Sequence, residues 1–136
     1  MSKTGIWIDH RKAVIVSERP EGEHIDTVLS NVEKHLERAG DSPLEGSYEA
    51  LQVPADDKRQ RALTGNLNTF YDAVIAKTGS AGALYIFGPG EAKGELKRRL
   101  EHRKLASRIA AIEAADKLTD PQIAAKAREF FKIPPP

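Results

Sequence analysis

The apolar run Ala83-Leu-Tyr-Ile-Phe87 is the feature that most restricts the fold of this chain. A strand with one face in water alternates apolar and polar residues, whereas a strand covered on both faces is apolar throughout. We therefore predict an interior strand here, in a sheet with helices packed on both faces. The run ends at Gly88-Pro89-Gly90, a sequence typical of a tight turn.

Three segments before this run predict an antiparallel β-meander. Residues 5–9 and 13–17 are rich in β-branched and aromatic side chains, and the polar turn His10-Arg11-Lys12 separates them. After a second polar turn, residues 25–30 alternate apolar and polar side chains. Because short connections join antiparallel neighbours, these three strands should pair in order.

Three further segments have the period of amphipathic helices. The first begins near Asp57 and carries one apolar stripe: Leu63, Leu67, Phe70, Tyr71 and Val74. The second runs from Glu91 to about Arg103, and its core-facing residues are Ala92, Leu96 and Leu100. The third opens with the capping box Thr119-Asp-Pro-Gln122, ends at Pro134–Pro136, and carries Ile123, Ala127, Phe130 and Phe131.

Together with a fifth strand at residues 108–113, these segments give the order β-β-β-α-β-α-β-α. A meander followed by two right-handed crossovers produces a mixed five-stranded sheet with helices on its faces. We therefore predict an α/β fold of the ribonuclease H-like type. The length of 136 residues fits one domain, residues 1–136, with a long polar loop at 34–57 and a proline tail at 134–136.

The composition excludes several kinds of site. Without cysteine, the chain has no disulfide, no thiolate metal ligand and no cysteine nucleophile. Its apolar runs are too short to span a bilayer, and Asp9 interrupts any apolar core of a signal peptide. We expect a cytoplasmic protein that does not enter a membrane.

The net charge of +1 conceals two regions of opposite sign. Residues 18–57 carry eleven acids and three bases, and residues 93–108 carry seven bases and two acids. Such segregation can steer a polyanion to one face. The candidate phosphate contacts lie on the second helix: Lys93, Lys97, Arg98, Arg99, Arg103 and Lys104. The alternative is a solvated helix face, neutralised by acidic loops and by pairing of Glu95 with Arg98 or Arg99.

The turn at Gly88-Pro89-Gly90 does not match a nucleotide cradle. A P-loop motif is missing, and Lys93 occupies the position of the third glycine in a dinucleotide-binding fingerprint. Glu91 and Glu95 in the first helical turns would also repel a phosphate. We predict instead a strand-to-helix turn that orients the basic helix.

Acids and histidines give a weak case for catalysis. Asp9 follows the first strand, and Glu113 and Asp116 lie at the end of the fifth, where a nuclease would hold divalent metals. However, residues 83–87 carry no acid, and the four histidines lack the spacing of metal ligands. We predict no catalytic residue, cofactor or metal site. A metal-dependent hydrolase using Asp9 with Glu113 or Asp116 is the alternative.

Two segments, "YIFGPGEAKGEL" and "IEAADKLTDPQIAAKAREFF", resemble bacterial relatives of the archaeal and eukaryotic peptide-release factors, as does the order of elements. The strongest motif is Gly88-Pro89-Gly90-Glu91-Ala92-Lys93. More specifically, the chain resembles the central domain of those factors and of pelota rescue proteins. Small bacterial members are called translational machinery or host-attachment proteins. The resemblance covers nearly the whole chain and implies a translation context.

The chain departs from the release factors in one respect. Their central domain carries a Gly-Gly-Gln tip, between the third strand and the first helix, that promotes hydrolysis of peptidyl-tRNA. Residues 34–57 contain Gly40 and Gly46 but not this tripeptide, and Gln52 and Gln60 lack adjacent glycines. Pelota proteins also lack it and act on ribosomes. We therefore expect a non-enzymatic protein that binds the ribosome or another structured RNA. A homodimer formed through an exposed sheet edge is a third alternative.

Overall fold

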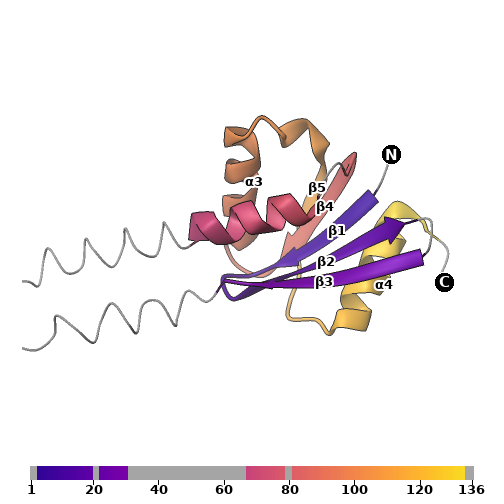
Figure 1. Cartoon of the computed structure of the whole chain (residues 1–136). Coiled ribbons are helices and arrows are strands. Elements are labelled where there is room, and N and C mark those ends of the chain that lie inside the picture. Colours follow the sequence, from indigo (N-terminus) through magenta and orange to yellow (C-terminus); the bar gives the residue numbers. More distant parts are fainter. Residues whose placement is uncertain (1–2, 20–21, 31–66, 79–80, 134–136) are drawn as a thin grey trace, which may run out of the picture.

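The computed structural model describes residues 3–19, 22–30, 67–78 and 81–133 (Figure 1). The strands are β1 (Lys3–Ile8), β2 (Lys12–Arg19), β3 (Gly22–Leu29), β4 (Ala83–Gly88) and β5 (Ile109–Ala114). The helices are a helix at residues 67–78, here called helix 67–78, then α3 (Ala92–His102), the 3-10 helix η1 (Ala106–Arg108) and α4 (Asp120–Phe131). None of the helices in these ranges is long and apolar enough to cross a bilayer.

The strands form one mixed sheet in the order β3-β2-β1-β4-β5. β1 pairs with β2, and β2 with β3, in antiparallel ladders, whereas β1–β4 and β4–β5 are parallel. The predicted mixed five-stranded α/β sheet is therefore confirmed. The third strand begins earlier than predicted, at Gly22, because its ladder with β2 extends to the pair Arg19–Gly22.

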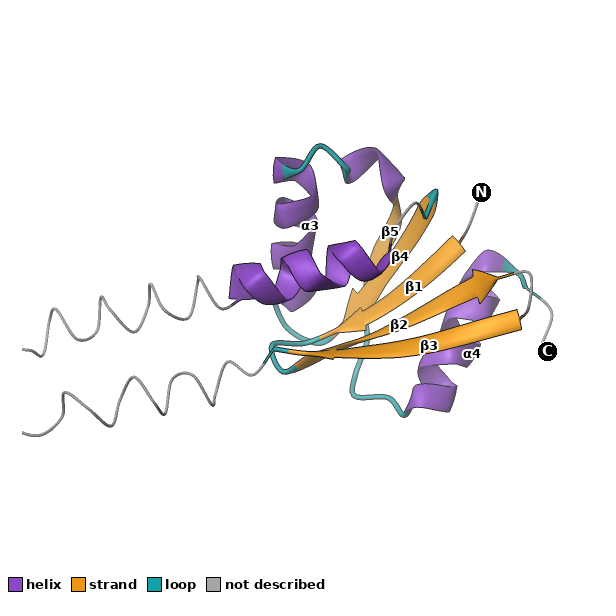
Figure 2. Ribbon diagram, in the orientation of Figure 1, coloured by secondary structure: helices purple, strands orange, loops and turns teal. Residues whose placement is uncertain are grey.

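Helices cover both faces of the sheet (Figure 2). Helix 67–78 and α3 pack on one face, here called the α3 face, and α4 packs on the opposite face, the α4 face. Alternate residues of β4 enter the two cores, with Leu84 and Ile86 on the α3 face and Tyr85 and Phe87 on the α4 face. The apolar run thus has both faces buried, as predicted.

The two labelled α-helices have the predicted core-facing stripes, and α4 also has its predicted N-terminal cap. Ala92, Leu96 and Leu100 of α3 are fully buried. The capping box of α4 is present, since the Thr119 hydroxyl accepts the N–H of Gln122 and the Gln122 side chain accepts that of Thr119. Lys132, in the left-handed conformation with φ of 56°, ends α4 before the predicted proline stop.

The predicted strand-to-helix turn connects β4 to α3. Gly88 has φ of 150°, and a Cβ at this position would lie 2.3 Å from the carbonyl oxygen of Ile8. Gly90 has φ of 67°, a left-handed conformation that glycine adopts without steric cost. Glycine is thus required at position 88 by the contact with Ile8, and it is favoured at position 90 by the left-handed backbone.

Several predictions fall outside the described residues. These are the start of the first helix near Asp57, its residue Leu63, the polar loop at 34–57 and the proline tail at 134–136.

Candidate nucleic-acid interface

The six candidate bases of α3 and its C-terminal turn fall into two groups. Successive residues of an α-helix are rotated by about 100°, so when Arg99 lies toward helix 67–78, Arg98 lies at the flank of α3 and Lys97 on its outer side. Arg99 is partly buried, whereas Lys97, Arg98 and Lys104 are exposed. The position on the helix therefore decides which bases reach solvent.

Asp72 of helix 67–78 engages two of the six bases. Its carboxylate accepts two hydrogen bonds from Arg99, each 2.8 Å long, and one of 3.1 Å from Nη1 of Arg103. The hydrogen bond from Arg99 is the main reason that the pKa of Asp72 is lowered. Such bidentate pairs fix geometry as well as charge. Arg99 and Arg103 therefore join two helices.

Glu95 points to the same helix and to the β1–β2 turn. The Tyr71 hydroxyl donates a 2.5 Å hydrogen bond to Oε1 of Glu95, and Nε2 of His10 lies 2.9 Å from the same oxygen. Burial, and then the Glu95 carboxylate, raise the pKa of Tyr71. The expected pairing of Glu95 with Arg98 or Arg99 is therefore wrong, because the Glu95 carboxylate contacts Tyr71 and His10 of other elements instead.

The remaining four bases are Lys93, Lys97, Arg98 and Lys104. Lys93 donates a hydrogen bond to the carbonyl oxygen of Gly90 and so braces the turn before α3. Within the described residues, Lys97, Arg98 and Lys104 form no ion pair. Lys97 and Arg98 of α3, and Lys104 in the turn after it, are thus the candidate cations that are exposed and not engaged by a described acid.

Lys104 stands where helices usually end in glycine. Its φ is 61°, its N–H donates to the carbonyl of Glu101, and the next N–H, of Leu105, donates to the carbonyl of Leu100. This is the Schellman pattern of a helix C-terminus. A lysine in the left-handed conformation costs about 1–2 kcal/mol relative to glycine. The packing of the described residues around Lys104 does not explain why a lysine stands there.

Two of the three candidate metal-binding acids accept hydrogen bonds through their carboxylates. Asp9 Oδ1 accepts the N–H groups of Arg11 and Lys12, and the Tyr85 hydroxyl donates to Oε1 of Glu113. The backbone oxygen of Asp116 accepts the indole N–H of Trp7. Among the described residues, no group of three histidine or acidic side chains is placed to hold a metal ion. No contact of these acids favours a hydrolase.

Asp72 is the residue that sequence reasoning missed. It follows Tyr71 of one apolar stripe, just as Arg99 precedes Leu100 of another. Opposite charges at the edges of two stripes that face the same core are a usable signal for an interhelical ion pair. That signal becomes specific only when the packing of the two helices is known.

No protein-family model matches the chain, and no curated protein matches it. Two solved structures are similar to it over 97% of its length. The Thermoplasma acidophilum Pelota protein is 15% identical, with a TM-score of 0.51 and 39% of that chain covered. An archaeal translation termination factor, aRF1, is 14% identical, with a TM-score of 0.50 and 40% covered. The chain thus spans about two fifths of each, and it has the fold of a pelota- and release-factor-like domain.

Proposed function

We propose that this protein is a cytoplasmic, translation-related factor that binds the ribosome or another structured RNA and catalyses no reaction. The observation that carries the proposal is the set of three exposed cations on α3 and its C-terminal turn that form no ion pair with another described residue: Lys97, Arg98 and Lys104. The fold shared with a translation termination factor and a Pelota protein supports the translation context. The relation to small bacterial translational machinery or host-attachment proteins is part of this proposal.

The contact would be made with phosphates. Lysine and arginine side chains hold the nucleic-acid backbone without reading base sequence, and binding then weakens as salt rises. Arg99 and Arg103, which the sequence also suggested as contacts, would act indirectly by holding α3 against helix 67–78 through Asp72. Lys93 would support the turn before α3.

Co-sedimentation with purified ribosomes and separated subunits, at low and moderate salt, tests the proposal. The test variant is Lys97→Gln/Arg98→Gln/Lys104→Gln, which removes these three cations. The matched control removes three exposed charges elsewhere: Lys3→Gln/Lys77→Gln/Lys132→Gln. We expect saturable binding by the wild type and the control, and loss of binding by the test variant.

Two results would contradict the proposal. One is wild-type protein that remains at the top of every gradient. The other is equal loss of binding in the test and control variants, which would indicate general electrostatic attraction rather than a surface on α3.

The exposed edge of β3 favours the homodimer as a second candidate. Ile25 and Leu29 on this edge strand are 39% and 61% exposed. Unpaired edge strands are common sites of association. Sedimentation velocity over a range of protein concentrations would detect such a dimer, and a constant monomer mass would exclude it.

A further inference from the structure

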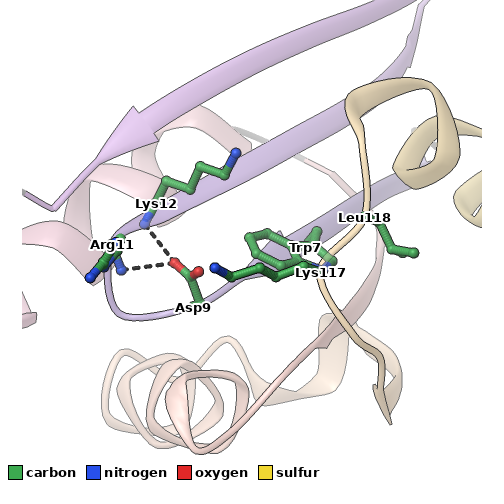
Figure 3. A pocket seen from close by; sticks show the side chains of 6 residues that line it. All are labelled: Trp7, Asp9, Arg11, Lys12, Lys117 and Leu118. Carbon is green, nitrogen blue, oxygen red and sulfur yellow. Dashed lines mark hydrogen bonds between the residues drawn. The ribbon is translucent and has the colours of Figure 1, made fainter.

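A pocket of about 250 Å³ opens at the carboxyl end of β1 (Figure 3). The turn after β1 contributes Asp9, Arg11 and Lys12 to its wall, and the connection from β5 to α4 contributes Lys117 and Leu118. Trp7, at the end of β1, forms its base. Ligands of open α/β sheets bind beyond the carboxyl ends of parallel strands, and β1 is parallel to β4.

The walls of this pocket are held in place by hydrogen bonds. Trp7 is 1% exposed, and its indole N–H donates a 3.1 Å hydrogen bond to the backbone oxygen of Asp116. On the opposite wall, Asp9 Oδ1 accepts the N–H groups of Arg11 and Lys12, each at 2.8 Å. The two walls are 105 or more residues apart in sequence, yet each is fixed before a ligand arrives.

The pocket carries an excess of positive charge. Three cations, Arg11, Lys12 and Lys117, line the pocket together with one carboxylate, that of Asp9. Within the described residues, neither lysine forms an ion pair, and Nζ of Lys12 lies 5.8 Å from the centre of the Trp7 ring. In Figure 3 the Lys117 side chain extends in the direction of Asp9. The cations outnumber the single carboxylate, and this net positive charge favours an anionic ligand.

We propose that this pocket binds a phosphate group, held by the side chains of Lys12 and Lys117 with Arg11 at the rim. Side chains must supply the contacts, because Asp9 already occupies the backbone N–H groups of Arg11 and Lys12. The volume lies just below the range of about 300–1,000 Å³ found for drug-sized ligands, which suits a phosphate and little more than its attached sugar. The phosphate belongs to a free nucleotide or to an RNA backbone.

This site is independent of the surface proposed on α3. Trp7 packs in the core of the α4 face, whereas α3 packs in the core of the opposite face. Variants of the pocket and of α3 therefore separate the two proposals.

Trp7 is the single tryptophan of the chain, so its indole N–H gives one isolated reporter signal. The ¹⁵N-labelled full chain would be titrated with adenosine 5′-monophosphate, with adenosine and with a short single-stranded RNA. We expect the monophosphate, the RNA or both to shift the Trp7 indole signal and the amide signals of Arg11, Lys12 and Lys117. Adenosine should leave them unchanged.

Lys12→Gln/Lys117→Gln should weaken the apparent affinity at least about tenfold, because the variant loses two hydrogen bonds to a charged group. Lys117→Gln alone, at an exposed position, is the milder variant, and Lys77→Gln, on helix 67–78, is the matched control that should bind as the wild type. Signal shifts with the monophosphate would show that the phosphate of a free nucleotide is sufficient for binding. Signal shifts with RNA alone would show that the pocket binds a phosphate of the RNA backbone. An unchanged indole signal with both probes would overturn the proposal, as would wild-type binding by the double variant.

Discussion

On the α3 face two helices are joined to each other by charged side chains, whereas on the α4 face a single helix packs on the sheet through apolar and aromatic contacts and the ion pair of Arg128 with Glu23 of β3. Asp72 binds Arg99 and Arg103, and Glu95 binds Tyr71 and His10, all at the edge of the α3 face. On the α4 face the Tyr85 ring stacks on Phe87 and Phe130, with centroids 4.6 and 4.0 Å apart.

This difference shows that the basic residues of α3 do not form a single binding surface, because some of them are engaged in contacts between helices. Where helix packs on helix, basic residues at the edge of the contact are engaged by acids, and only the outer ones can meet a ligand. On the α4 face, Lys12 and Lys117 line a pocket instead of an interhelical contact. The availability of each cation therefore follows from what its neighbours pack against.

The largest expected effects are core truncations on the two faces, Leu96→Ala and Ile123→Ala. Both side chains are fully buried, so each variant should lose about 2–5 kcal/mol of stability. Denaturant unfolding should be followed by far-ultraviolet circular dichroism and by Trp7 fluorescence. We expect coincident transitions, because β4 contributes to both cores. Separate transitions for the two probes would show that the faces unfold independently.

Two glycine substitutions sharpen the comparison, because they should have opposite signs. A Cβ at Gly5 would lie 2.6 Å from Cβ of Ala127, so Gly5→Ala should destabilise by about 1–3 kcal/mol as α4 is pushed from the sheet. At Gly94 of α3 nothing lies within 4 Å, so Gly94→Ala should stabilise by about 0.5–1 kcal/mol through helix propensity. Thermal unfolding measures the change in stability of each variant. Changes of the same sign in the two variants would contradict the contrast in packing.

Asp72→Asn tests the ion pairs of the α3 face. We expect a loss of about 1 kcal/mol at neutral pH, the upper range for pairs at the surface. The pKa of Asp72 is lowered below its ordinary value of 3.8, so its contribution is present above that value and is lost as pH falls through the folded pKa. The variant should therefore have a shallower acid limb in a plot of stability against pH. An acid limb identical to that of the wild type would contradict this role.

The smallest effects are expected at the ends of the two helices. Lys104 and Lys132 both have left-handed backbones in a Schellman pattern, with φ of 61° and 56°. Lys104→Gly and Lys132→Gly should each stabilise by about 1 kcal/mol or less, since glycine relieves the strain and costs backbone entropy. Only Lys104→Gly should also weaken RNA binding. Equal binding by the two variants would remove Lys104 from the proposed surface.

Much of the fold could be predicted because it is encoded in local patterns. The stripe Ala92, Leu96 and Leu100, the capping box at Thr119 and the apolar run at 83–87 each reflect a period or motif within one segment. The predicted ends of elements are less accurate. The start of β3 was predicted too late, because β3 extends as far as its pairing with β2 does. The bacterial family and the single-domain assignment remain predictions.

The site was less predictable because it depends on contacts between distant segments. Asp72 lies 27 residues before Arg99, and Lys117 reaches the pocket wall formed by Arg11 and Lys12 only after the sheet has formed. The spacing of Glu95 to Arg98 and Arg99 suited a local pair, yet Tyr71 and His10 are its partners. Tertiary packing overrode the helical pattern.

The salt dependence of ribosome binding tests the central claim most directly. The apparent association constant of the wild type and of Lys97→Gln/Arg98→Gln would be measured over a series of salt concentrations. Each lost phosphate contact should reduce the slope of log K against log salt by about 0.7–0.9. For the double variant we predict weaker binding and a slope that is smaller in magnitude by about 1.5. An unchanged slope, or binding insensitive to salt in the wild type, would contradict a phosphate-binding surface on α3.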